Sequence, residues 1–220
     1  MLPVLVALAL AAAPSPSPRS ISMAGDAKLS FRPNQLIASF LVSASNKDQV
    51  AARKSSDEKL AKFLRAVREA GVEQRNITLN EAGVAPDYRG NEVVGYAVNR
   101  SAVLIITDMA RVDDALTAAV RNGGTQSAQV ILQNTEHQSY ETKARVAAAT
   151  AARDRAKGVV EAVGAKLGLA VSVIDRTASV ESVAGGMFVV PPEGPVSTAF
   201  ANRELTAVSQ VTVQFDIDAP

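Results

Sequence analysis

The hydrophobic pattern of this chain switches repeatedly between a period of two residues and a period of three to four residues, without a regular rhythm. Alternation at period two predicts half-buried strands, and spacings of three and four predict amphipathic helices. Because the two kinds of segment intermix without a βαβα repeat, the pattern predicts an α+β fold with mainly antiparallel sheets. The main strands are expected at 36–44, 92–107, 128–132 and 211–217, and the helices at 47–70, 109–121 and 140–163.

The expected order of elements is ββαββαβαββ, which gives two βαβ-like halves with three helices packed on the sheets. Approximate boundaries for the two subdomains are 20–90 and 91–220. Gly25-Asp26 is expected to separate two short strands, and the stretch 83–91 is expected to be rich in turns because Gly, Pro and Asp punctuate it.

The third helix has an inner stripe of mostly small residues. Small side chains let a helix lie close against a sheet. The stripe is formed by Ala144, Ala148, Ala152, Ala156, Val159 and Val163.

The N-terminal residues indicate export. Residues 2–13 are almost wholly apolar, and Pro and Ser alternate through most of 14–19. An apolar run of this length is shorter than the roughly 20 residues that a membrane-spanning helix needs. The pattern therefore predicts a signal peptide at 1–13, a Pro/Ser-rich segment at 14–19 and an exported domain at 20–220 without a membrane span.

Composition excludes several kinds of site. The 23 Lys and Arg residues nearly balance the 22 Asp and Glu residues, so no long-range field attracts nucleic acid. With no Cys and one His, the chain lacks disulfides, thiolate metal sites, a cysteine nucleophile and the usual zinc cluster. Phosphate-binding and nucleophile-elbow motifs are also missing. The sequence indicates no cofactor, no metal site and no catalytic residue.

The remaining polar groups are interpreted as surface residues. His137 is expected in an exposed connection before the third helix. The carboxylate pairs Asp57-Glu58 and Asp113-Asp114 lie on helices, where adjacent positions point in different directions and cannot share a reacting atom. The third helix also carries a basic run, which is expected to face solvent and to pair with Asp154 or Glu161. That run consists of Arg145, Arg153, Arg155 and Lys157.

One segment, 176–202, is too long for an ordinary connection between elements. It contains four consecutive apolar residues beside prolines, which must either pack onto the domain or meet another chain. The candidate contact residues for an oligomer or a partner are Met187, Phe188, Val189, Val190, Pro191 and Pro192.

Six segments, taken in order, carry a pattern that none of them shows alone. They are ISMAGDAKLSFRP at 21–33, GVEQRNI at 71–77, GYAVNRSAVL at 95–104, DMARVDDAL at 108–116, ARVAAATAARDRA at 144–156 and VTVQFDI at 211–217. Together they resemble the SIMPL family of bacterial periplasmic proteins, which includes periplasmic immunogenic and oxidative-stress-defence proteins. The resemblance implies a two-part α+β fold, assembly into large oligomers and a link to envelope or oxidative stress. It implies no reaction.

Three functions remain open at this point. The first is a non-enzymatic periplasmic assembly or interaction protein, which the export signal, the missing catalytic groups and the apolar loop favour. The second is a binding module for a small ligand or an envelope component, using a cleft between the two halves. The third is an enzyme that uses two carboxylates, for which the sequence brings no pair together.

Overall fold

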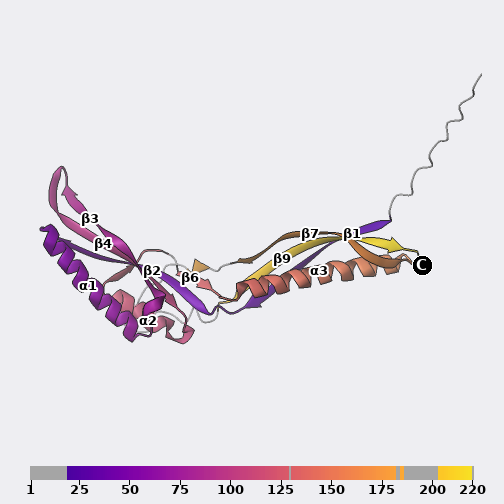
Figure 1. The fold of residues 1–220 in the computed structure, drawn as a ribbon, viewed down its shortest axis with the longest axis horizontal. Coiled ribbons are helices and arrows are strands. Elements are labelled where there is room, and N and C mark those ends of the chain that lie inside the picture. Colours follow the sequence, from indigo (N-terminus) through magenta and orange to yellow (C-terminus); the bar gives the residue numbers. More distant parts are fainter. Residues whose placement is uncertain (1–18, 129, 182–183, 186–202, 220) are drawn as a thin grey trace, which may run out of the picture.

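The computed structural model describes residues 19–219, except for residue 129 and the stretches 182–183 and 186–202. The described residues form two antiparallel sheets, each covered by helices, in an elongated molecule of two lobes joined by a narrow waist (Figure 1). The α+β prediction is confirmed. The expected signal peptide at 1–13 and most of the Pro/Ser-rich segment at 14–19 lie outside the described residues.

The first lobe holds a six-stranded sheet in the described part of the chain, with the order β3-β4-β2-β6-β8 and with β5 paired to β2. Helices α1 (Gln49–Glu69) and α2 (Val112–Arg121) pack on it (Figure 1). Its strands are β2 (Gln35–Asn46), β3 (Ile77–Arg89), β4 (Glu92–Ile106), β5 (Gly124–Gln126), β6 (Val130–Gln133) and β8 (Ala184–Gly185).

Local sequence explains where the helices of this lobe begin and end. The Asp48 carboxylate accepts a hydrogen bond from Ala51 N at 2.8 Å and so caps the start of α1. Gly71, with φ of 101°, follows the last turn. Asp108 caps a short 3₁₀ turn, Met109–Arg111, which leads into α2. All three signals are readable in the sequence.

The core of the first lobe lies between the sheet and α1. The even-numbered positions of β2 from Leu36 to Ala44 are buried, as their alternation predicts, and Phe40 among them meets Phe63 of α1 with ring centroids 5.9 Å apart. Leu60 and Val67 complete the buried stripe of α1. Burying one such large apolar side chain contributes roughly 1.5–3 kcal/mol relative to leaving it exposed.

The second lobe holds the three-stranded sheet of the described residues, β1 (Ser20–Phe31), β9 (Leu205–Asp218) and β7 (Lys166–Glu181), in the order β1-β9-β7. Helix α3 (His137–Ala162) lies along one face of this sheet (Figure 1). Strand β1 runs antiparallel to β9 in unbroken register, so the beginning and the end of the folded chain are neighbours. Within the described residues no helix combines the length and the apolar character needed to cross a membrane.

The expected turn at Gly25-Asp26 does not form, because β1 continues through both residues. Gly25 is buried under α3, and a Cβ atom there would lie 1.9 Å from the Ala148 carbonyl oxygen. Glycine is therefore required at this position by the close approach of a helix backbone, not by a change in chain direction.

The alanine stripe of α3 packs on the sheet, but its last turns differ from the prediction. The buried residues continue at intervals of four and end at Val160, whereas Val159 and Val163 are exposed. Positions four apart are neighbours on a helix, displaced by about 40° around the axis at each step. The buried stripe consists of Ala144, Ala148, Ala152, Ala156 and Val160.

Two segments expected to be irregular are strands. β3 extends to Arg89, so that the turn is reduced to Gly90-Asn91, and Pro86 is tolerated because β3 is an edge strand in the described sheet. β7 extends to Glu181, so its last six residues belong to the segment expected to stand apart at 176–202. A division into 20–90 and 91–220 passes through the β3–β4 hairpin, and both sheets contain strands from either side of it.

Candidate functional site

Two segments that the structure describes in full cross between the lobes at the waist, residues 32–34 from β1 to β2 and residues 134–136 from β6 to α3. The two segments are joined by backbone and side-chain hydrogen bonds. Asn34 N donates to Gln133 O at 2.9 Å. The Asn34 side chain donates to Thr135 Oγ1 at 2.8 Å and accepts from Thr135 N at 3.0 Å.

Asn134 makes the reciprocal connection, and it is buried. Its Nδ2 donates to Arg32 O at 2.7 Å, and its Oδ1 accepts from Glu136 N at 2.8 Å. One asparagine on each crossing segment thus holds the other segment. Because each amide uses both its donor and its acceptor, the two segments are fixed in one relative position.

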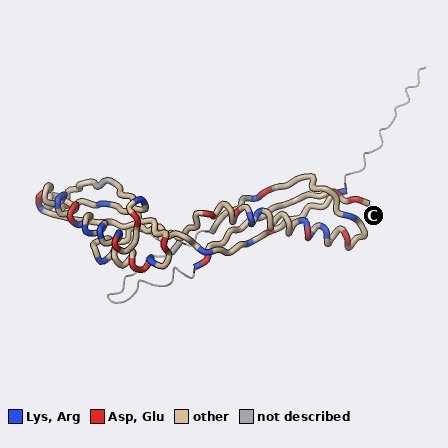
Figure 2. Tube along the Cα trace, turned by 60° about the horizontal axis from the view of Figure 1, so that its bottom comes forward, with Lys and Arg blue, Asp and Glu red and all other residues tan. Residues whose placement is uncertain are grey.

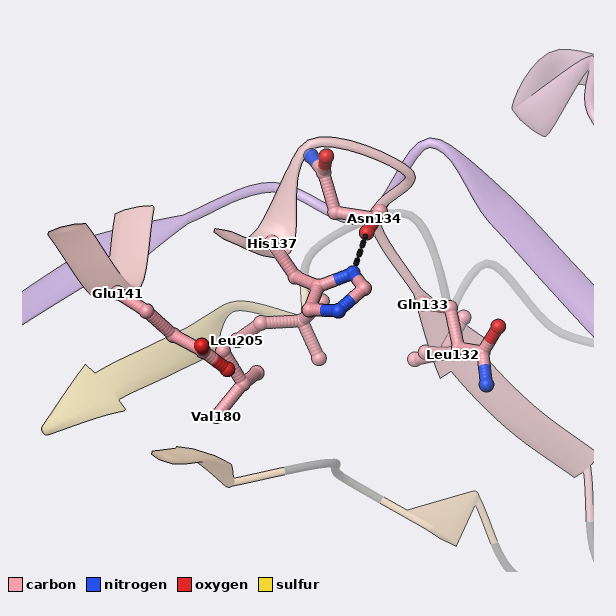
Figure 3. A pocket seen from close by; sticks show the side chains of 7 residues that line it. All are labelled: Leu132, Gln133, Asn134, His137, Glu141, Val180 and Leu205. Carbon is pink, nitrogen blue, oxygen red and sulfur yellow. Dashed lines mark hydrogen bonds between the residues drawn. The ribbon is translucent and has the colours of Figure 1, made fainter. Parts of the chain in front are cut away.

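A pocket of about 210 Å³ opens at this waist (Figure 3). It draws on both lobes, since its walls come from β6, from the start of α3 and from β7 and β9. Its apolar wall is formed by Leu132, Val180 and Leu205, and its polar wall by Gln133, Asn134, His137 and Glu141.

His137 is exposed, as predicted, but it belongs to the first turn of α3 and not to the connection before it. Its Nδ1 lies 3.1 Å from Asn134 O (Figure 3). A carbonyl oxygen can only accept, so Nδ1 carries the proton in this contact. Nε2 of the neutral ring is then left as an acceptor at the pocket.

Aromatic contacts fix the beginning of α3 over β1. The Tyr140 ring stacks on Phe31 with centroids 4.0 Å apart and planes 6° from parallel. The Lys143 ammonium lies 5.0 Å from the Tyr140 ring centroid, within the range of a cation–π contact. These contacts hold the turn of α3 that carries His137 and Glu141.

The carboxylate pairs stay apart, and the described residues contain no group of three His, Cys, Asp or Glu side chains that could hold a metal ion. Asp57 is ion-paired with Arg100, whose Nε also donates to the buried Ser56 hydroxyl at 3.1 Å. Asp113 is half-buried, and this burial, together with the charge of Asp114, raises its pKa above 3.8. The expectation of a fully solvated position is incorrect for Asp113.

The basic residues of α3 join the helix to the sheet. Arg155 donates to Asp26 of β1 at 2.9 Å, and Arg145 is ion-paired with Asp175 of β7 at 3.1 Å. Of the two expected partners, Glu161 pairs with Lys157 at 3.8 Å. Basic and acidic side chains are interspersed along both lobes in the described chain (Figure 2).

The outer strand β7 carries an exposed apolar surface, which we call the β7 patch. The four side chains are exposed by 83%, 56%, 61% and 54%, so all lie mainly in solvent, although β-branched and leucine side chains usually pack inside a sheet protein. They are Leu169, Val171, Val173 and Ile174. The sequence pattern predicts a strand here, but periodicity alone did not reveal that its large apolar residues remain uncovered.

The apolar residues that the sequence indicates as contacts lie outside the described residues. They are Met187, Phe188, Val189, Val190, Pro191 and Pro192.

The sequence matches a protein family and several named relatives. The model of the family SIMPL, described as a protein of unknown function (DUF541), matches residues 21–215. The 26 kDa periplasmic immunogenic protein of Brucella melitensis biotype 1 is 26% identical over 90% of this chain and 84% of its own length. The protein of the same name from Brucella abortus gives the same values. The uncharacterized protein YggE of Edwardsiella ictaluri is 22% identical over 88% of this chain and 81% of its own. The chain therefore belongs to the SIMPL family.

Proposed function

We propose that this chain is a periplasmic, non-enzymatic protein that assembles with other copies of itself through the β7 edge of the second lobe. The observation that carries the proposal is the β7 patch. An edge strand presents unpaired backbone N–H and C=O groups, and exposed apolar side chains beside them favour pairing with another strand.

The opposite edge of the same sheet provides a contrast. At β1, Arg155 donates to the Ala24 carbonyl oxygen at 2.8 Å and to Asp26, so a cation and an anion cover the middle of that strand. Charged side chains on an edge strand disfavour pairing with a further strand. The middle of β7 also carries an ion pair to α3, Asp175 with Arg145, but the exposed Val173 and Ile174 stand beside it, and β1 has no such exposed aliphatic pair among its described residues.

The register of β7 favours one stretch of the strand as the proposed contact. Its pairing with β9 shifts between Leu167 and Ser172 and again between Arg176 and Ser179, whereas residues 172–176 are in regular register. Bulges twist an edge and end pairing, so the regular stretch is the segment on which a second strand fits best. It contains two of the four exposed aliphatic residues.

The periplasmic location is supported by the relatives and by the N-terminal pattern. Two of the relatives are named as periplasmic proteins, and none of the three is named for a reaction. The apolar run at 2–13 followed by Pro and Ser is typical of an export signal. A role in envelope or oxidative stress is part of the same proposal and rests on the family resemblance.

Light scattering on a size-exclusion column tests the assembly. We expect the mature protein to elute at a mass several times that of the monomer. Replacing Val173 and Ile174 together by Lys should lower that mass, because the two ammonium groups would be buried at the contact. The matched control is Val146→Lys on the outer face of α3, where the side chain is 62% exposed, and the mass should not change.

A second variant for the same experiment lacks residues 185–195, which include the apolar contact residues indicated by the sequence. If this deletion dissociates the assembly and the β7 variant does not, the contact is made by that segment and the β7 assignment is wrong. A monomer for the unaltered mature protein would overturn homo-assembly altogether.

A further inference from the structure

The waist pocket takes Val180 from β7 but none of the residues of the β7 patch, and it has unused hydrogen-bonding capacity. The Asn134 amide is already bonded to Arg32 O and Glu136 N, which fixes it in the wall of the pocket. The Gln133 side-chain oxygen accepts from Gln35 Nε2 at 3.0 Å, and its amide is turned away from the His137 ring (Figure 3). The ionisable groups of the lining are His137 and Glu141.

His137 and Glu141 are four residues apart on α3, so they lie on the same face of the helix, one turn from each other. Figure 3 shows the imidazole ring and the carboxylate beside Leu205 and Val180. The bond from His137 Nδ1 to Asn134 O directs Nε2 as an acceptor when the ring is neutral. Among the described residues, Glu141 has neither an ion pair nor a hydrogen bond from another side chain.

The pocket thus offers two acceptors, one of them an anion, next to an apolar wall. A ligand that satisfies both must donate at least two hydrogen bonds and carry positive charge, because a charge-assisted bond to a carboxylate is stronger than a neutral one. Its carbon atoms would lie against Leu132, Val180 and Leu205. A volume of about 210 Å³ admits only a small molecule.

We propose that the waist pocket binds a small organic cation, a primary ammonium or amidinium compound with a short apolar chain. Its N–H groups donate to His137 Nε2 and to the Glu141 carboxylate. A metal ion is the less suitable occupant, since two side chains leave most of a coordination sphere unfilled. Because the pocket takes residues from β6, α3, β7 and β9, a bound cation would connect the two lobes.

Ligand-observed saturation-transfer NMR tests this proposal on the full mature chain, and it works whatever the mass of the assembly. The probes are n-butylammonium and butyramidinium in phosphate buffer, which contains no competing amine. Neutral n-butanol and anionic butyrate serve as matched probes of similar size. We expect saturable transfer to the two cations, with dissociation constants on the order of millimolar for ligands of about five heavy atoms.

Variants locate the site. Glu141→Gln keeps the size and removes the charge, and should weaken butylammonium binding by about tenfold or more. His137→Ala should also weaken it. Glu136→Gln makes the same change of charge at an exposed side chain that does not line the pocket, so binding should stay within about twofold of the unaltered protein.

Three results would overturn the assignment. Equal binding of n-butanol and n-butylammonium would show an apolar pocket without selectivity for a cation. Equal loss in Glu136→Gln and Glu141→Gln would show only a long-range effect of charge. Saturable Ni²⁺ binding that is lost in His137→Ala, without binding of the organic probes, would show a metal pair instead.

Discussion

Gly25 of β1 lies directly against Ala148 of α3, and a side chain at residue 25 would enter the helix backbone. A Cβ atom built on Gly25 would stand 1.9 Å from the Ala148 carbonyl oxygen and 2.5 Å from the Ala152 amide nitrogen. The alanine stripe and this glycine belong together, because each removes side-chain bulk from the same contact. The helix can therefore lie on the strand almost backbone to backbone.

Gly25→Ala should destabilise the fold, although alanine normally suits a strand at least as well as glycine. Backbone atoms cannot rotate away, so α3 must move, and overpacking of this kind costs about 1–3 kcal/mol or more. Urea denaturation followed by circular dichroism measures the loss. The control is Gly158→Ala within α3, where a Cβ meets nothing within 4 Å, and where the helix should gain about 0.5–1 kcal/mol. Equal effects at the two glycines would contradict the close contact.

Replacing the two waist asparagines, Asn34 and Asn134, by alanine should lower the free energy of unfolding by different amounts. Asn134→Ala removes two part-buried hydrogen bonds of a buried side chain, one to Arg32 O and one from Glu136 N, and such bonds contribute about 0.5–1.5 kcal/mol each. Asn34 makes similar bonds to Thr135 but is exposed, so water can replace them, and Asn34→Ala should cost less than about 1 kcal/mol. Thermal unfolding of the two variants side by side checks the order, and a larger loss at Asn34 would refute it.

The sequence predicts which helices and strands form better than it predicts which of them pack or pair with one another. The three helices and the alternating strands at 36–44, 92–107 and 211–217 are confirmed, because period and caps are local signals. The pairing of β1 with β9 is not a local signal: it joins Ser20 to Asp216, and no short-range pattern identifies that partner. For the same reason Gly25 resembles a turn residue until the position of α3 is known.

The waist pocket could not be predicted from the sequence, because it too depends on contacts between segments that are distant along the chain. His137 has no partner with metal-ligand or catalytic spacing, so its interpretation as an exposed residue is the natural one. Its relation to Val180 and Leu205 depends on where two strands from the end of the chain lie against the start of α3. A His and a Glu four residues apart at a helix start are the one signal that could have directed attention there.

The ion pair between Arg155 and Asp26 should contribute little to stability. The two side chains are 50% and 68% exposed, and exposed pairs are typically worth about 0.2–1 kcal/mol. A double-mutant cycle with Arg155→Gln and Asp26→Asn should give a coupling free energy in that range at low salt, and a smaller one at high salt. A coupling unaffected by salt would mean that the pair is less accessible to solvent than its exposure indicates.

Because the pKa of Asp113 is raised, the stability of the first lobe depends on pH, and the direction of the shift fixes the direction of that dependence. Burial, and then the charge of Asp114, disfavour the ionised carboxylate in the folded state, whereas the unfolded chain titrates near 3.8. The folded state therefore holds the proton more tightly, and Asp113 lowers stability at neutral pH but not below 3.8. Asp113→Asn should stabilise the protein at neutral pH, and the gain should shrink as the pH falls through the interval between the raised pKa and 3.8.

Asp114→Asn is the matched control for this prediction. Asp114 is exposed, so its replacement relieves only the repulsion on Asp113 and should give the smaller gain. Both carboxylates stand in the first turn of α2, where the helix dipole favours a negative charge by about 0.3–1 kcal/mol. The pKa of Asp113 is raised in spite of that attraction, so removing its charge should stabilise on balance. Urea denaturation across the acidic range measures the difference, and a gain that grows as the pH falls would show that the dipole, not burial, dominates at this position.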